Sequence, residues 1–181
     1  MKKDRGQITY VGIDPAFREN GFVVCEIYPN SECKFRTMQK FSNFIEWLDM
    51  IKNQHKHHER HFVFCIENSY LQKETFDMSG GLSVVARKSR NVGMNMAVSQ
   101  IVVDCIREYF PIQTYEISPK EKGAKWSEQI FAATVKSDAI VLLNYKGLKN
   151  EQDKRDSYQV ARHGYYLHQN SILMDRAKYK K

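Results

Sequence analysis

The sequence predicts an α/β protein in which helices flank a mixed five-stranded sheet. Short apolar runs follow one another closely near the N-terminus, a helical periodicity separates them from a fourth run, and long helical stretches fill the second half. The chain has 181 residues, 42% of them hydrophobic. A chain of this length buries roughly two thirds of its unfolded surface, so we expect one packed domain over residues 1–181.

The first three strands are indicated by runs of β-branched and aromatic residues. Ile8–Asp14 and Gly21–Ile27 have this composition, and the turn signal "YPNSE" leads from the second run into Cys33–Thr37. Tight connections join antiparallel neighbours. These runs therefore predict a three-stranded meander.

A helix and a fourth strand are expected next. Apolar residues recur at helical spacing at Phe41, Phe44, Ile45, Leu48 and Ile51. His61–Glu67 is then a continuous apolar run of strand length. Because a helix lies in the connection, this strand is expected to pair in parallel with one of the first three.

The second half of the chain is mainly helical in pattern. A long helix is predicted over Leu82–Tyr109, and Pro111 stops it. A fifth strand is expected at Ile112–Ile117, followed by two helices at Ser127–Leu143 and Asn150–Leu167. The predicted order of elements is β-β-β-α-β-α-β-α-α.

The charge of the chain favours a polyanionic partner. The net charge is +7, and a surplus of this size attracts polyanions such as nucleic acid, although it can also serve solubility alone. Cations gather in three places, which are Arg87, Lys88 and Arg90, then Lys120, Lys122 and Lys125, and finally the tail "RAKYKK", which also suits a solvated chain end. No apolar run of 18 residues and no signal-peptide core is present, so an intracellular, cytoplasmic protein without membrane contact is expected.

Four carboxylates stand at positions that a sheet edge would bring together. Asp14 and Glu67 each end a predicted strand, and Asp153 and Asp156 are three apart on one face of a predicted helix. Oxygen ligands without histidine or cysteine suit Mg²⁺ or Mn²⁺. Two such ions about 4 Å apart can drive phosphodiester hydrolysis, and no small-molecule cofactor is expected.

Each of these acids also has a purely structural interpretation. Asp153 is three residues after Asn150 and suits a helix N-terminus, where a carboxylate satisfies free backbone N–H groups. Asp14 precedes a proline and suits a turn, and Glu67 suits an exposed strand end. The joint pattern of four acids is what favours a metal site.

Four segments of the chain carry a family resemblance. They are "VGIDPAFRENGFVV", "FCIENSY", "ISPKEKGAKW" and "DKRDSYQVA", and together they span nearly the whole chain. In order and in strand position they resemble the RuvC-type Holliday junction resolvases, members of the ribonuclease H-like superfamily. Ala16 stands where the family often has glycine, and Ser157 where it often has alanine. We therefore expect a divergent branch, phage-like or bacterial.

The resemblance implies a ribonuclease H-like fold and a crossover junction endodeoxyribonuclease, acting in DNA recombination, repair or phage DNA processing. It implies two Mg²⁺ ions per active site, with Mn²⁺ as a substitute, and branched DNA, a four-way junction, as substrate. The catalytic, metal-binding acids that it implies are Asp14, Glu67, Asp153 and Asp156. The family's basic residue near the scissile phosphate matches Lys120 or Lys122, and Lys120 is preferred because it directly follows Ser-Pro.

The resemblance also implies a DNA contact and a homodimer. Tyr70 matches the aromatic that the family places near the branch point, although a half-buried tyrosine under the next loop is equally expected. The family works as two-fold dimers, so part of the long helix is an interface candidate. Its stripe of Val92, Met96, Ser99 and Val103 also suits a buried core face.

Other functions remain open from the sequence. One is a ribonuclease H-like nuclease acting on RNA–DNA hybrids or flaps. Another is a non-catalytic protein that binds DNA structures, with the acids serving only as helix caps. The histidines between His55 and His61 lack cysteine partners, which favours a solvated polar face over a zinc site.

Overall fold

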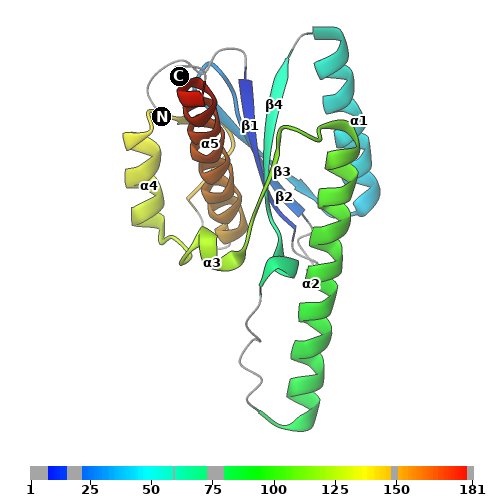
Figure 1. Ribbon diagram of the computed structural model, residues 1–181. Helices are drawn as coiled ribbons and strands as arrows, with labels where there is room; N and C mark the ends of the chain where they lie inside the picture. Colours follow the sequence, from blue (N-terminus) through cyan, green and yellow to red (C-terminus); the bar gives the residue numbers. More distant parts are fainter. Residues whose placement is uncertain (1–7, 16–21, 59, 73–79, 148–150, 179–181) are drawn as a thin grey trace.

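The computed structural model describes residues 8–15, 22–58, 60–72, 80–147 and 151–178, which form a sheet flanked by helices (Figure 1). The strands lie in the order β5-β4-β1-β2-β3-β6. Their bounds are β1 Ile8–Asp14, β2 Phe22–Ile27, β3 Glu32–Met38, β4 His61–Glu67, β5 Thr114–Ile117 and β6 Val141–Leu142. Gly21, the expected start of the second strand, lies outside the described residues.

The sheet is mixed, as the sequence predicted. β1, β2 and β3 form an antiparallel meander, and β4 pairs in parallel with β1. In that register Ile13 lies opposite Ile66, so Asp14 and Glu67 occupy the next positions on neighbouring strands. Parallel strands end at the same edge of a sheet. The two strand-end acids are therefore neighbours.

Over the described residues the sheet has six strands, so the prediction of five was wrong. β6 pairs in parallel with β3, with Val141 opposite Glu32. It lies inside the stretch predicted as helix, because α4 (Glu128–Ser137) ends early and Ala139 adopts the left-handed backbone region with φ 55°. The side chain of Asn144 extends the pairing, since it bonds the backbone N–H of Phe35 at 2.8 Å and its C=O at 2.7 Å.

The helices form a layer on each side of the sheet. The remaining bounds are α1 Phe41–His58, η1 Ser69–Leu71, α2 Leu82–Tyr109, α3 Pro119–Lys122 and α5 Gln152–Lys178. α1 and α2 cover one face, and α4 and α5 cover the other (Figure 1). The long helix predicted over Leu82–Tyr109 is confirmed with the same bounds. No helix in the described ranges is both long and apolar enough to cross a membrane.

Alternating side chains of β1 divide between two hydrophobic cores. Val11 and Ile13 pack toward α1 and α2, whereas Tyr10 packs toward α4 and α5. This is the period-two pattern of a strand covered on both faces. β1 is thus fixed from both sides, which gives Asp14 at its end a rigid position.

The helix α5 lies directly on the backbone of β1. A Cβ added to Gly12 would stand 2.2 Å from both the amide nitrogen of Ala161 and the carbonyl oxygen of Ser157. Gly164 allows a similar approach, since a Cβ there would be 2.6 Å from the Cβ of Cys65. The absence of side chains at these glycines lets helix and sheet backbones meet. The first turns of α5 are thereby held close to the end of β1.

Candidate metal centre

Three aspartates converge where β1 ends beneath the start of α5. Asp14, Asp153 and Asp156 each offer a carboxylate oxygen, and these oxygens all lie within 4.8 Å of one another. Asp156 is buried, with 1% of its surface exposed, and the other two are partly buried. Among the described residues this set, here called the three-aspartate cluster, has the spacing of a metal site. Asn150, where the helix carrying Asp153 was predicted to begin, lies outside the described residues.

Glu67 lies beside the three-aspartate cluster and is paired with a cation. Its Oε2 is 2.6 Å from the ammonium of Lys122, and both residues are buried, at 8% and 7% exposure. The same ammonium is 3.7 Å from Oδ2 of Asp156. Lys125 approaches that oxygen to 3.5 Å from a more exposed position. The site thus joins four carboxylates to two ammonium groups.

The short helix α3 decides which lysine enters the site. Ser118 caps it, accepting a hydrogen bond from the backbone N–H of Glu121, while the Glu121 carboxylate accepts from the N–H of Ser118. Residues two apart on a helix point about 200° apart. Lys122 therefore turns inward against Glu67, and Lys120, which the sequence favoured, is exposed.

Several carboxylates lie close together at a buried site, and this crowding shifts the pKa values of Asp14 and Lys122. Burial and the neighbouring carboxylate of Glu67 raise the pKa of Asp14 from 3.8 to about 7. Burial alone would lower the pKa of Lys122, but the carboxylates of Asp14 and Glu67 outweigh it, so this pKa is raised. The carboxylates therefore outweigh the cations present, and an added cation would relieve their repulsion.

The donor set fits a hard divalent cation. Carboxylate oxygens within 4.8 Å of one another can share one ion, and histidine and cysteine take no part in the described cluster. Asp14, Asp153 and Asp156 would hold such an ion, with Glu67 next to it. Neither a scan against protein-family models nor a search of the curated proteins found a match to this sequence.

Tyr70 is exposed on the turn that follows Glu67. It sits in the single turn η1, three residues after Glu67, with 61% of its surface exposed. Its backbone N–H donates to Oδ1 of Asn68 at 2.9 Å, and the buried Asn68 amide donates to Glu116 at 2.6 Å. A fixed asparagine thus holds the turn that presents the Tyr70 ring to solvent, and the loop under which the ring was alternatively expected, residues 73–79, lies outside the described residues.

The cations of the long helix lie apart from the core. Arg87 and Arg90 are exposed and Lys88 is partly buried, on the N-terminal half of α2, which projects beyond the sheet (Figure 1). Within the apolar stripe of this helix, Ser99 and Val103 are buried, whereas Val92 and Met96 are partly buried. The stripe therefore belongs to the hydrophobic core at its C-terminal end, and its side chains are only partly buried on the projecting half of the helix.

The histidine-rich stretch makes local contacts. Nδ1 of His55 is 2.7 Å from the carbonyl oxygen of Arg60, and its ring packs edge-on against Phe110. His61 is exposed, 5.9 Å from His55 between ring centroids. These contacts leave the described histidines outside any group with ligand spacing.

Sequence reasoning missed one residue that touches the three-aspartate cluster. Gln152 donates a hydrogen bond from Nε2 to Oδ1 of Asp156 at 2.7 Å. Its spacing of four residues from Asp156 on a helix was the available signal. The preference for Lys120 rested on the Ser-Pro motif, which does not reveal which way each side chain of a four-residue helix points; Lys122 is the one that contacts Glu67.

Proposed function

We propose that this protein is a metal-dependent endonuclease with a ribonuclease H-like fold that cuts branched DNA, as a Holliday junction resolvase of the RuvC type acting on intracellular DNA. The observation that carries the proposal is the convergence of Asp14, Asp153 and Asp156 within 4.8 Å. These residues come from opposite ends of the chain, and all three stand at positions that match the family's motifs. Glu67 on the neighbouring strand supports the same site.

The residues of the site divide the work by their positions. Asp14, Asp153 and Asp156 would hold one divalent cation. Asp14 and Glu67 would together hold a second. When bound, such ions supply an activated water and stabilise the leaving oxygen. The ammonium of Lys122 balances the charge of Glu67 beside the three-aspartate cluster. It would also place positive charge next to a bound phosphate.

Branched DNA is supported by features around the metal centre. The exposed ring of Tyr70 lies three residues from Glu67, where it could stack on a base at an opened branch point. The cations on α2 provide phosphate contacts. A homodimer paired along α2 would place two metal centres for two cuts, one in each of two strands.

The test is cleavage of a four-way junction by Asp14→Asn. Replacing this carboxylate by an amide removes a charged ligand, so we expect cleavage in Mg²⁺ to fall below detection. Junction binding in Ca²⁺ should persist, because the DNA-contacting residues are untouched. Asp104→Asn is the matched control, since Asp104 is exposed on α2 and accepts a hydrogen bond from Gln100. Normal cleavage by Asp14→Asn would refute the site.

The substrate assignment is tested separately with matched DNA and RNA substrates. Wild-type protein should cut the four-way junction in preference to a flap, a linear duplex or an RNA–DNA hybrid. A preference for the hybrid would replace the resolvase proposal with a ribonuclease H-like activity. Tight junction binding without product in Mg²⁺ or Mn²⁺ would leave a non-catalytic DNA-binding protein.

A further inference from the structure

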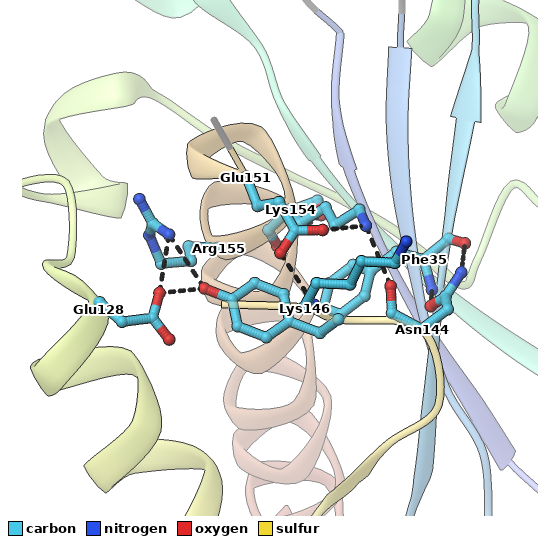
Figure 2. Close-up of polar contacts among 9 residues, drawn as sticks. Phe35, Glu128, Asn144, Lys146, Glu151, Lys154 and Arg155 are labelled. Carbon is cyan, nitrogen blue, oxygen red and sulfur yellow. Dashed lines mark hydrogen bonds and ion pairs between the residues drawn. The ribbon is translucent and has the colours of Figure 1, made fainter. Parts of the chain in front are cut away.

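A chain of hydrogen bonds leads outward from the three-aspartate cluster to a different part of the fold. Gln152 donates to Oδ1 of Asp156, and Nη2 of Arg155 donates to Oε1 of Gln152 at 2.8 Å. Nη1 of Arg155 then donates to Oε2 of Glu128 and to the hydroxyl of Tyr145, each at 2.9 Å. Figure 2 shows Arg155 reaching from α5 to Glu128 on α4.

The polarity of this chain fixes the amide of Gln152. A glutamine amide has one accepting end and one donating end, and the two ends look alike in shape. The guanidinium of Arg155 can only donate, so it requires the amide oxygen on its side. The amide nitrogen must then face Asp156. A flipped amide would set its oxygen against a carboxylate and its NH₂ group against a guanidinium.

The fixed amide in turn fixes the carboxylate of Asp156. Oδ1 is held by Gln152, while Oδ2 faces the ammonium groups of Lys122 and Lys125 at 3.7 and 3.5 Å. The two oxygens therefore have different partners, which sets the rotation of the carboxylate. Ligands held in this way bind metal more tightly than ligands that rotate freely.

Arg155 is itself anchored by the body of the protein. It is 6% exposed, and its partner Tyr145 packs its ring against Phe131 of α4 with centroids 4.7 Å apart. Phe131 belongs to the core between α4, α5 and the sheet. The position of Asp156 is thus fixed by the packed core on α4 as well as by the first turn of α5.

We propose that Gln152 is a positioning residue for Asp156, that Arg155 acts through Gln152, and that together they strengthen divalent-cation binding at the three-aspartate cluster. The proposal rests on the metal centre of the proposed function. Neither residue is expected to touch the ion or the DNA. The prediction concerns affinity for the ion, which can be measured without any nucleic acid.

The experiment measures Mn²⁺ binding to the full chain by titration calorimetry, without DNA. Gln152→Met keeps the length of the side chain and removes the donor to Asp156, so the Kd for Mn²⁺ should rise roughly tenfold. Arg155→Met should also raise the Kd for Mn²⁺, because the amide of Gln152 is then free to flip. Since Arg155 acts through Gln152, the double variant should bind no more weakly than Gln152→Met alone.

Lys154→Met is the matched control for Arg155→Met. Lys154 is the adjacent residue, and its ammonium contacts Glu151 at 2.6 Å and the carbonyl oxygen of Asn144 at 3.0 Å (Figure 2). Both substitutions remove one positive charge near a cation site, which by Coulomb's law should tighten Mn²⁺ binding slightly. Only loss of positioning predicts weaker binding, so Arg155→Met and Lys154→Met should change affinity in opposite directions.

The outcomes separate this proposal from the proposed function. Unchanged Mn²⁺ affinity in Gln152→Met overturns the positioning role, and Arg155→Met matching Lys154→Met overturns the part assigned to Arg155. Wild-type protein that binds Mn²⁺, loses affinity in Gln152→Met, and yet cuts no branched DNA supports positioning while refuting the nuclease. Wild-type protein that binds no Mn²⁺ overturns both. Melting temperatures without metal confirm that each variant is folded.

Discussion

Asp14 is the residue on which the site depends most. Its carboxylate is crowded by Glu67, Asp153 and Asp156, and burial together with these charges raises its pKa to about 7. An unfolded aspartate titrates near 3.8. Between these values the folded, metal-free protein binds a proton at Asp14 that the unfolded chain releases. The contribution of Asp14 to stability is therefore present at low pH and is lost as the pH rises toward 7.

Metal binding reverses this dependence, because a cation binds the ionised carboxylate. The rise in melting temperature caused by saturating Mn²⁺ should be small at about pH 5.5 and large at about pH 8. Thermal unfolding with Mn²⁺ and with EDTA at each pH measures it. Asp14→Asn serves as the control, because it removes the titrating group and should flatten the dependence. An equal rise at both pH values in the wild type would contradict the raised pKa.

The two lysines of α3 provide a second residue-level prediction. Lys122→Met leaves the buried carboxylate of Glu67 without its ammonium, so the metal-free protein should lose about 3 kcal/mol of unfolding free energy. Lys120→Met, two positions away on an exposed face, should stay within about 0.5 kcal/mol of the wild type. Urea unfolding compares the two. Equal losses would show that Lys122 does not balance the cluster.

The packing of α5 on β1 is what brings acids from distant parts of the sequence together. Gly12 lies under the backbone of residues 157–161 without space for a side chain. The same contact sets Asp156 above the end of β1. A displacement of α5 would therefore change both the stability of the protein and the geometry of the three-aspartate cluster.

Gly12→Ala tests this contact. Its Cβ would meet backbone atoms at 2.2 Å, so α5 must move, and we expect a loss of about 3 kcal/mol and weaker Mn²⁺ binding. Gly93→Ala is the control on α2, where a Cβ meets nothing within 4 Å. Glycine in a helix interior destabilises the helix relative to alanine, so the unfolding free energy of this control should rise by up to about 1 kcal/mol. Similar stability of the two variants would argue against close packing of α5.

Sequence patterns predicted the elements that depend on local regularity. The apolar runs of β1 and β2 and the helical stretch of α2 are such elements, and their structure agrees with the prediction. β6 could not be foreseen, because two residues carry no period and their strand geometry depends on pairing with β3. The inward turn of Lys122 likewise depends on how the cap of α3 sets the helix against Glu67.

The convergence of the acids was only partly predictable for the same reason. The strand ends at Asp14 and Glu67 could be placed on one edge from the parallel pairing. The contact of Gln152 with Asp156 was visible as a helical spacing. The reach of Arg155 to Glu128 was not, because it joins α5 to α4, and nothing in the sequence indicates how two helices from separate segments pack together.

The molecule as a whole combines a mixed sheet between two layers of helices with a net positive charge. Helices cover both faces of the sheet, and the carboxyl ends of β1 and β4 meet the first turns of α5 at one edge (Figure 1). The chain carries a net charge of +7 although this edge is acidic, so the rest of the chain has an excess of cations. A net positive charge suits the polyanionic substrate of the proposed function.

Anomalous diffraction from crystals grown with Mn²⁺ tests the metal centre most directly. The anomalous signal should place an ion within bonding distance of carboxylate oxygens from Asp14, Asp153 and Asp156, and Asp14→Asn crystals should lose or weaken that signal. Mn²⁺ located away from these three carboxylates, or absent from them at saturating concentration, would contradict the metal centre and the nuclease built on it.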